Sequence, residues 1–267
     1  MPSLFFGLIP LLVSPPLLTT DCDEFYRNRE TGRSEAVMAL ECYASQEQTP
    51  YALVRQAYLE FFIAEFHSDE KKPLLLEAIR HSEEALLRFG PKYSIPEYMK
   101  RTPEERKVLA EALYTYGLST ARYIDIEGQW EAIKRMGDIK RSMDSLLRIN
   151  EKETAFYGAH RTLGIFHTKV PEIAGGKIEF ARKYLMTAIE ATRHSGELSR
   201  YPANNIAYAD LMHKLGETRE GCHHLQLVAD LSENDLRSLA NGLYFESLAK
   251  VGEAKNLFAE RKCKDAI

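Results

Sequence analysis

Residues 158–191 read "GAHRTLGIFHTKVPEIAGGKIEFARKYLMTAIEA" and contain two apolar stripes separated by a proline and a glycine pair. Apolar residues recur at steps of three and four, which is the spacing of an amphipathic helix. The first stripe, which begins just before this stretch, is Phe156, Ala159, Leu163, Phe166 and Val170, and the second is Ile178, Ala181, Leu185, Ala188, Ile189 and Thr192. Pro171 ends the first helix because it lacks an amide hydrogen and disfavours helical backbone in the preceding residue. The stretch therefore predicts a helical hairpin.

The two histidines of this stretch do not have the spacing of a metal site. His160 and His167 would share a helix face but lie about 10 Å apart along the axis. Histidines that bind one ion on a helix usually come four residues apart, and Arg161 beside His160 would repel a cation. We interpret both histidines as helix-face residues near a core, with a ligand-facing role as the alternative.

The hairpin matches the register of a tetratricopeptide repeat (TPR). Such repeats place Leu-Gly on the first helix and small, large and small residues on the second. Leu163-Gly164 supply the first element, and Ala181, Leu185 and Ala188 the second. Gly164 and Ala181 would let the two helices approach closely. The connection is about five residues longer than in the standard repeat.

Similar helical segments lie on both sides of the hairpin, as expected because a lone hairpin cannot bury its apolar face. They are residues 51–67, 74–91, 106–124, 130–150 and 204–231, with residues 235–262 as a helical capping element. Residues 90–103, which contain three prolines, are predicted to form an insertion loop. The prediction is an all-α, TPR-like α-solenoid of about ten helices in roughly five antiparallel hairpins.

The N-terminus carries no charge before Asp21, and its prolines argue against a membrane-spanning helix. We predict a signal peptide at residues 1–20, followed by a TPR-like helical-repeat domain at residues 21–267 and periplasmic localisation. An apolar N-terminal arm packed on the solenoid is the alternative. Asp21 stands where a lipoprotein signal requires a small residue, which argues against a lipid anchor at Cys22.

The chain has four cysteines, an even count that suggests disulfides in an exported protein. Four cysteines allow three pairings, and buried free thiols are the alternative. Because they cluster at the two ends of the chain, we predict the pairs Cys22–Cys42 and Cys222–Cys263.

Catalytic patterns are missing from the sequence. It has no P-loop, GxGxxG, HExxH or CxxCH, and "GLSTA" at residues 117–121 lacks the last glycine of a nucleophile elbow. The net charge of −4 is distributed without a basic stripe, which argues against nucleic-acid binding. We therefore expect no enzyme activity, no cofactor and no metal.

The order "ALYTYG", a tryptophan-containing helix, "FYGAHRTLGIFHTKVP", "KIEFARKYLMTAIE" and "NNIAYADLM" resembles the T-component (TatT-like) family of TRAP transporters. The resemblance extends over most of the chain from about residue 23. It implies an oligomeric periplasmic protein that works beside an extracytoplasmic solute-binding protein and offers a cleft to a small hydrophobic ligand. By position in the similar segment, the candidates for the cleft lining are Tyr116, Trp130, Tyr157, His160 and Arg161.

Two functions follow as hypotheses. The first is a periplasmic TPR-like accessory protein of a TRAP-type solute uptake system, which binds a solute-binding receptor and a small amphipathic or apolar ligand. The second is a generic TPR adaptor that holds a peptide or protein segment on its concave face.

Overall fold

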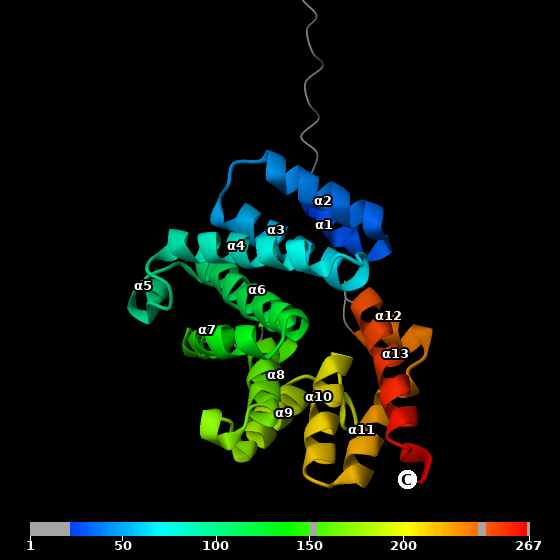
Figure 1. Cartoon of the computed structure of the whole chain (residues 1–267). Helices are drawn as coiled ribbons and strands as arrows, with labels where there is room; N and C mark the ends of the chain where they lie inside the picture. Colours follow the sequence, from blue (N-terminus) through cyan, green and yellow to red (C-terminus); the bar gives the residue numbers. More distant parts are fainter. Residues whose placement is uncertain (1–21, 150–153, 240–243, 266–267) are drawn as a thin grey trace, which may run out of the picture.

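The structure, a computed structural model, describes residues 22–149, 154–239 and 244–265, so the predicted signal peptide lies outside the described residues. The described part is almost entirely helical (Figure 1). Its elements are α1 (Cys22–Asn28), η1 (Arg29–Thr31), α2 (Arg33–Ser45), α3 (Pro50–Phe66), α4 (Lys71–Phe89), α5 (Ile95–Met99), α6 (Pro103–Glu127), α7 (Gln129–Arg148), α8 (Thr154–Lys169), η2 (Glu172–Ala174), α9 (Ile178–Ala191), β1 (Arg193–Ser195), β2 (Leu198–Ser199), α10 (Pro202–Lys214), α11 (Thr218–Ala229), α12 (Glu233–Leu239), α13 (Tyr244–Glu260) and η3 (Cys263–Asp265). The all-α prediction is confirmed for this part of the chain.

Helix α6 shows how local sequence sets an element boundary. The hydroxyl of Thr102 accepts a hydrogen bond from the backbone N–H of Glu105, and the Glu105 carboxylate accepts one from the N–H of Thr102. This capping box satisfies two N–H groups that have no partner in the first turn of a helix. Pro103 follows at the first helical position, where a missing N–H costs nothing.

The predicted hairpin is formed by α8 and α9, which pack against each other. Leu163, Ala181, Leu185 and Ala188 are buried. A Cβ added to Gly164 would lie 2.4 Å from Cγ of Leu185, so the helices approach as closely as the small residue allows. In the connection, a Cβ on Gly176 would lie 1.9 Å from the carbonyl oxygen of Val170, which makes glycine necessary there.

The start of α8 differs from the prediction. Ala155, Phe156 and Tyr157 all have left-handed backbone, with φ of 51°, 53° and 60°, and right-handed helix follows from Gly158. Phe156 therefore does not belong to the apolar stripe of the helix. Its ring instead stacks on Tyr201, with the centroids 5.8 Å apart.

The region predicted as an insertion loop, residues 90–103, is also more ordered than expected. It contains the short helix α5, and Tyr98 is fully buried. The Tyr98 hydroxyl accepts a hydrogen bond from the backbone N–H of Tyr93 at 2.8 Å. The aromatic side chain therefore anchors this connection against α6 and its neighbours.

The helices pack mainly against neighbours in the chain, and the resulting arc brings its two ends together (Figure 1). Contacts run from α3 to α4, α4 to α6, α6 to α7 and onward to α11 and α13, and buried apolar residues form several clusters along this path. The C-terminal α13 also contacts η1 near the N-terminus. The hydroxyl of Tyr58 on α3 donates a hydrogen bond to Glu246 on α13, across 188 residues of sequence.

A disulfide ties each end of the arc. One joins Cys22 to Cys42 between α1 and α2, with the Cα atoms 5.6 Å apart. The other joins Cys222 on α11 to Cys263 in η3, with the Cα atoms 5.3 Å apart.

Candidate functional site: a cavity inside the arc

The arc surrounds a half-open cavity of about 1220 Å³ whose lining comes from α1, η1, α3, α6, α7, α8, α10 and α13. Most of its wall is apolar. The apolar lining residues on the middle helices are Leu118, Ala121 and Ile124 of α6, Ala132, Ile133, Met136 and Ile139 of α7, Ala155, Phe156, Ile165 and Phe166 of α8, and Ala203, Ile206 and Ala207 of α10. The volume lies above the range of about 300–1,000 Å³ that is usual for small-molecule sites, and the largely apolar lining is typical of them.

Arg161 provides the main polar group on the α8 side. Its side chain lines the cavity, yet the residue is only 6% exposed. Its Nη1 donates to Oδ1 of Asn204 at 2.7 Å, and its Nη2 donates to the hydroxyl of Tyr114 at 2.6 Å. The guanidinium carbon lies 4.5 Å from the centroid of the Tyr201 ring, within cation–π range.

Gly158 makes room for this arrangement. A Cβ at this position would lie 2.3 Å from Cε2 of Tyr114, the residue that accepts a hydrogen bond from Arg161. The left-handed turn at residues 155–157 immediately precedes it. Non-glycine residues in this conformation cost about 1–2 kcal/mol each, and such strain is concentrated at functional sites.

Glu246 is the acidic counterpart on α13 and is also 6% exposed. Its carboxylate accepts hydrogen bonds from the hydroxyl of Tyr201 at 3.1 Å and from that of Tyr58. Burial raises the pKa of both tyrosines well above the usual value, and the Glu246 charge raises it further. Both hydroxyls therefore stay protonated and act as donors.

A second group of charges lies on the η1 and α3 side of the cavity. Arg55 pairs with Glu111 at 2.8 Å, and its guanidinium carbon lies 4.5 Å from the centroid of the Tyr26 ring. Burial raises the pKa of the Glu111 carboxyl, although the Arg55 charge acts in the opposite direction. The guanidinium of Arg29 lies 4.4 Å from the same Tyr26 ring.

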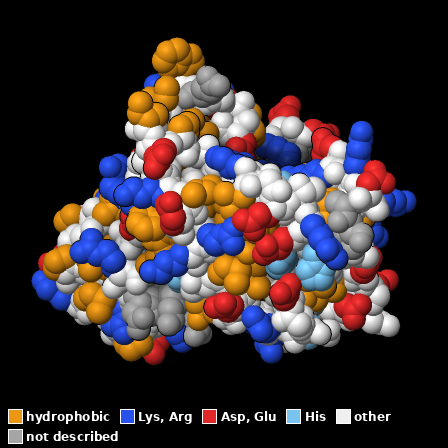
Figure 2. Space-filling view, turned by 90° about the horizontal axis from the view of Figure 1, so that it is seen from below, with side chains coloured by type: hydrophobic (Ala, Val, Ile, Leu, Met, Phe, Trp, Pro, Cys, Tyr) orange, Lys and Arg blue, Asp and Glu red, His pale blue; other side chains and the backbone are white. Residues whose placement is uncertain are grey.

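One face of the molecule mixes both signs of charge. Figure 2 shows hydrophobic patches between basic and acidic side chains on this face, without a broad field of one sign. This face therefore lacks the single-sign patch that a nucleic-acid groove requires.

The structure places the five candidate residues from the sequence in different surroundings. Arg161 lines the cavity, and the other four candidates do not. Tyr116 is buried and accepts a hydrogen bond from Lys92 at 2.7 Å, while Trp130 is 80% exposed. Tyr157 and His160 contact each other, with ring centroids 5.3 Å apart.

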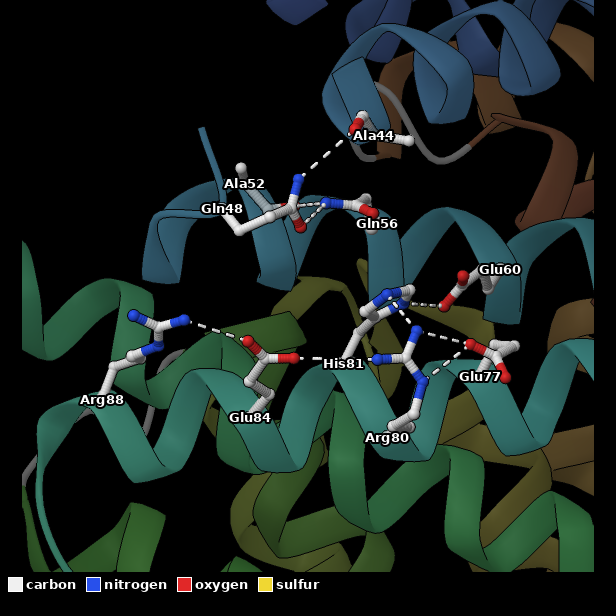
Figure 3. Close-up of polar contacts among 10 residues, drawn as sticks. All are labelled: Ala44, Gln48, Ala52, Gln56, Glu60, Glu77, Arg80, His81, Glu84 and Arg88. Atoms are coloured by element: carbon white, nitrogen blue, oxygen red, sulfur yellow. Dashed lines mark hydrogen bonds and ion pairs between the residues drawn. The ribbon is translucent and has the colours of Figure 1, made fainter. Parts of the chain in front are cut away.

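Outside the cavity, a partly buried polar network joins α3 and α4 (Figure 3). Arg80 donates to Nε2 of His81 at 2.6 Å, so this histidine carries its proton on Nδ1 and donates to Glu60 at 2.9 Å. Burial raises the pKa of the Glu60 carboxyl. Glu60, Glu77 and His81 lie close enough together to form a metal-ligand set. However, the Arg80 guanidinium donates hydrogen bonds to the carboxylate of Glu77 and to the imidazole of His81, and its positive charge opposes a cation there.

A second such set, within the described residues, is His213 with Cys222 and Cys263. Because the two cysteines form a disulfide, neither offers the thiolate that binds metals. His167, which the sequence placed near a core, is buried and accepts a hydrogen bond from the N–H of Lys177 at 3.2 Å.

Two comparisons with known proteins give no match. No model of a protein family matches the chain, and no curated protein matches it. Among the described helices, none combines the length and the apolar character needed to cross a membrane.

Proposed function

We propose that this chain is a TPR-like periplasmic accessory protein of a TRAP-type solute uptake system, which forms an oligomer, binds a solute-binding receptor and holds a small amphipathic ligand. The observation that carries the ligand part is the cavity, which has a mostly apolar wall and contains the buried polar groups of Arg161, Glu246 and their tyrosine partners. An amphipathic molecule matches both surfaces.

The charged groups on the cavity wall are suited to binding. The hydroxyls of Tyr114 and Tyr201 remain protonated because burial raises their pKa. These side chains orient a polar group by hydrogen bonds and stacking, whereas nucleophilic catalysis needs an activated nucleophile with a nearby base. The proposal therefore assigns the cavity no reaction.

The receptor part is supported by an exposed apolar pair on α7. Trp130 is 80% exposed and Ile133 is 69% exposed, and residues three apart share one face of a helix. Tryptophan is among the residue types that dominate protein–protein binding energy. The transport role and the TRAP partner rest on the resemblance described from the sequence.

The experiment is a pair of binding measurements on the full chain. A neutral apolar fluorescent probe, N-phenyl-1-naphthylamine, should bind, and Ala121→Trp, which fills the cavity from α6, should abolish binding. Ala191→Trp, on the exposed end of α9, is the matched control and should bind normally.

Calorimetry against a purified solute-binding protein of a TRAP system should then show association, weakened by Trp130→Ala. Retained probe binding in Ala121→Trp would contradict the ligand site. Absence of receptor binding together with binding of an extended peptide would favour the adaptor function.

A further inference from the structure

Arg161 differs from the other arginines of the cavity in its charge partners. The other three lining arginines each have a carboxylate within 4 Å: Arg29 with Glu30 at 3.8 Å, Arg55 with Glu111 at 2.8 Å and Arg122 with Glu65 at 2.6 Å. Arg161 makes its hydrogen bonds to an amide, a phenol and a backbone carbonyl oxygen. No carboxylate of the described residues lies within 4 Å of it.

A buried cation without an anionic partner is unfavourable, because burial removes the water that stabilises the charge. Glu246, the buried acid described above, does not supply that partner directly. Its carboxylate bonds to the hydroxyl of Tyr201, whereas Arg161 lies over the ring of the same tyrosine. Glu246 also accepts the hydrogen bond of Tyr58.

Arg161 retains donors for an additional ligand. A guanidinium has five N–H groups, and Arg161 makes three hydrogen bonds in the described part of the chain. Two donors are thus left for an acceptor in the cavity. A carboxylate matches the planar arrangement of these donors better than any single oxygen does.

An apolar path leads away from this group along α8. Ile165, Phe166 and Val170 line the cavity beyond Arg161. At 1.5 Å per residue, the distance along the axis from Arg161 to Val170 is about 14 Å. Ile133 of α7, which is 69% exposed, also lines the cavity and marks where this path meets solvent.

We infer that the ligand of the cavity is a monocarboxylic acid with an apolar tail, whose carboxylate binds Arg161 and whose tail lies along α8 toward Val170. This inference rests on the proposed ligand-binding function and narrows it to one chemical class. The acid completes the charge pairing of Arg161, and the tail covers the apolar wall.

Calorimetric titration of the full chain with decanoate, decanol and decylamine tests the inference. Decanoate should bind most tightly. Arg161→Gln should weaken decanoate binding by about tenfold or more, the amount expected for a charge-assisted hydrogen bond, and leave decanol binding unchanged. Lys183→Gln is the control, because it removes an exposed positive charge from α9, outside the cavity lining, and it should leave decanoate binding unchanged.

The outcomes separate the inference from the function on which it rests. Decanol binding as tight as decanoate, or decanoate binding that survives Arg161→Gln, overturns the carboxylate assignment and leaves the ligand site intact. Tighter binding of decylamine also overturns it and points to Glu246. Failure of all three ligands overturns the ligand function itself.

If circular dichroism shows that Arg161→Gln is unfolded, Arg161→Lys replaces it. This variant keeps the charge but loses the planar pair of donors, so decanoate should bind with an affinity between those of wild type and the charge-free variant. Either of two results overturns the assignment. One is an unchanged decanoate affinity in Arg161→Lys, and the other is wild-type binding of decanol that is as tight as that of decanoate.

Discussion

We expect the buried His224 to make the stability of this protein sensitive to mild acid. His224 is almost inaccessible to solvent, and its Nδ1 accepts a hydrogen bond from the side-chain amide of Asn205 at 3.0 Å. Burial lowers the pKa of His224 below the ordinary 6.5, and the Glu197 carboxylate offsets this only in part. The pKa values of His67, His167 and His213 are lowered by burial as well.

We predict that the free energy of unfolding falls as the pH falls below about 6.5. Below this pH the imidazole of His224 is protonated in the unfolded chain but remains neutral in the folded protein, which favours unfolding. The carboxyls of Glu60 and Glu111 act in the opposite direction, since their raised pKa lets the folded state take up protons first. Urea unfolding between about pH 7.5 and pH 5.5 should therefore show a smaller loss for His224→Gln than for wild type. Equal losses would show that His224 does not contribute.

At the scale of elements, the α8–α9 hairpin was predictable because its signals are local. Pro171 and the following glycines end one helix and permit the turn, and Leu163 and Leu185 are buried as their spacing requires. The left-handed turn before Gly158 was not predictable, because Ala155 and Phe156 carry no sequence signal for that backbone.

The cavity was predictable only through Arg161. Glu246 and Tyr58 belong to helices at opposite ends of the chain, and a periodic pattern within one helix carries no information about such pairs. Tyr201 and Asn204 lie beside Arg161 because α10 packs on α8. The only sequence indication of this contact was a polar residue, Asn204, in a largely apolar helix. Trp130, a candidate for its residue type, is exposed because aromatic character alone does not specify burial.

We predict that Gly164→Leu lowers the free energy of unfolding by about 1–3 kcal/mol, because the new side chain would overlap Leu185. Gly252→Leu is the control, since a Cβ at this position in α13 would meet nothing within 4 Å. Thermal unfolding should rank the two variants in that order.

Leu185→Ala added to Gly164→Leu should restore part of the loss, because the two side chains compete for one space. Purely additive effects of the two substitutions would show that Gly164 and Leu185 are not in contact.

At the scale of the whole molecule, closure of the arc makes the cavity. Glu246 links α13 to α3 through Tyr58 and to the start of α10 through Tyr201. Removing its carboxylate leaves two buried hydroxyl groups without their acceptor, which is more costly than removing an exposed ion pair.

We predict that Glu246→Ala speeds amide hydrogen exchange in α13 and weakens binding of the neutral apolar probe. Glu253→Ala is the matched control: Glu253 also lines the cavity from α13, but its ion-pair partner among the described residues is Lys250 one turn away, at 2.6 Å. The control should leave both measurements unchanged. Faster exchange in both variants would show that the hydrogen bonds of Glu246 are not what stabilises the position of α13, and another contact, for example the Cys222–Cys263 disulfide, would then be responsible.

The contact between α3 and α13 also gives the chain an order of assembly. Neighbouring helices close short loops, which form quickly, whereas the Tyr58–Glu246 contact must bring together residues 188 positions apart. During synthesis the early helix pairs can form as they emerge, and the wall of the cavity that α13 supplies is added last. A nascent or truncated chain ending before α13 would therefore keep much of its helix content but hold the ligand less tightly, so that ligand occupancy would be higher in finished molecules than in unfinished ones.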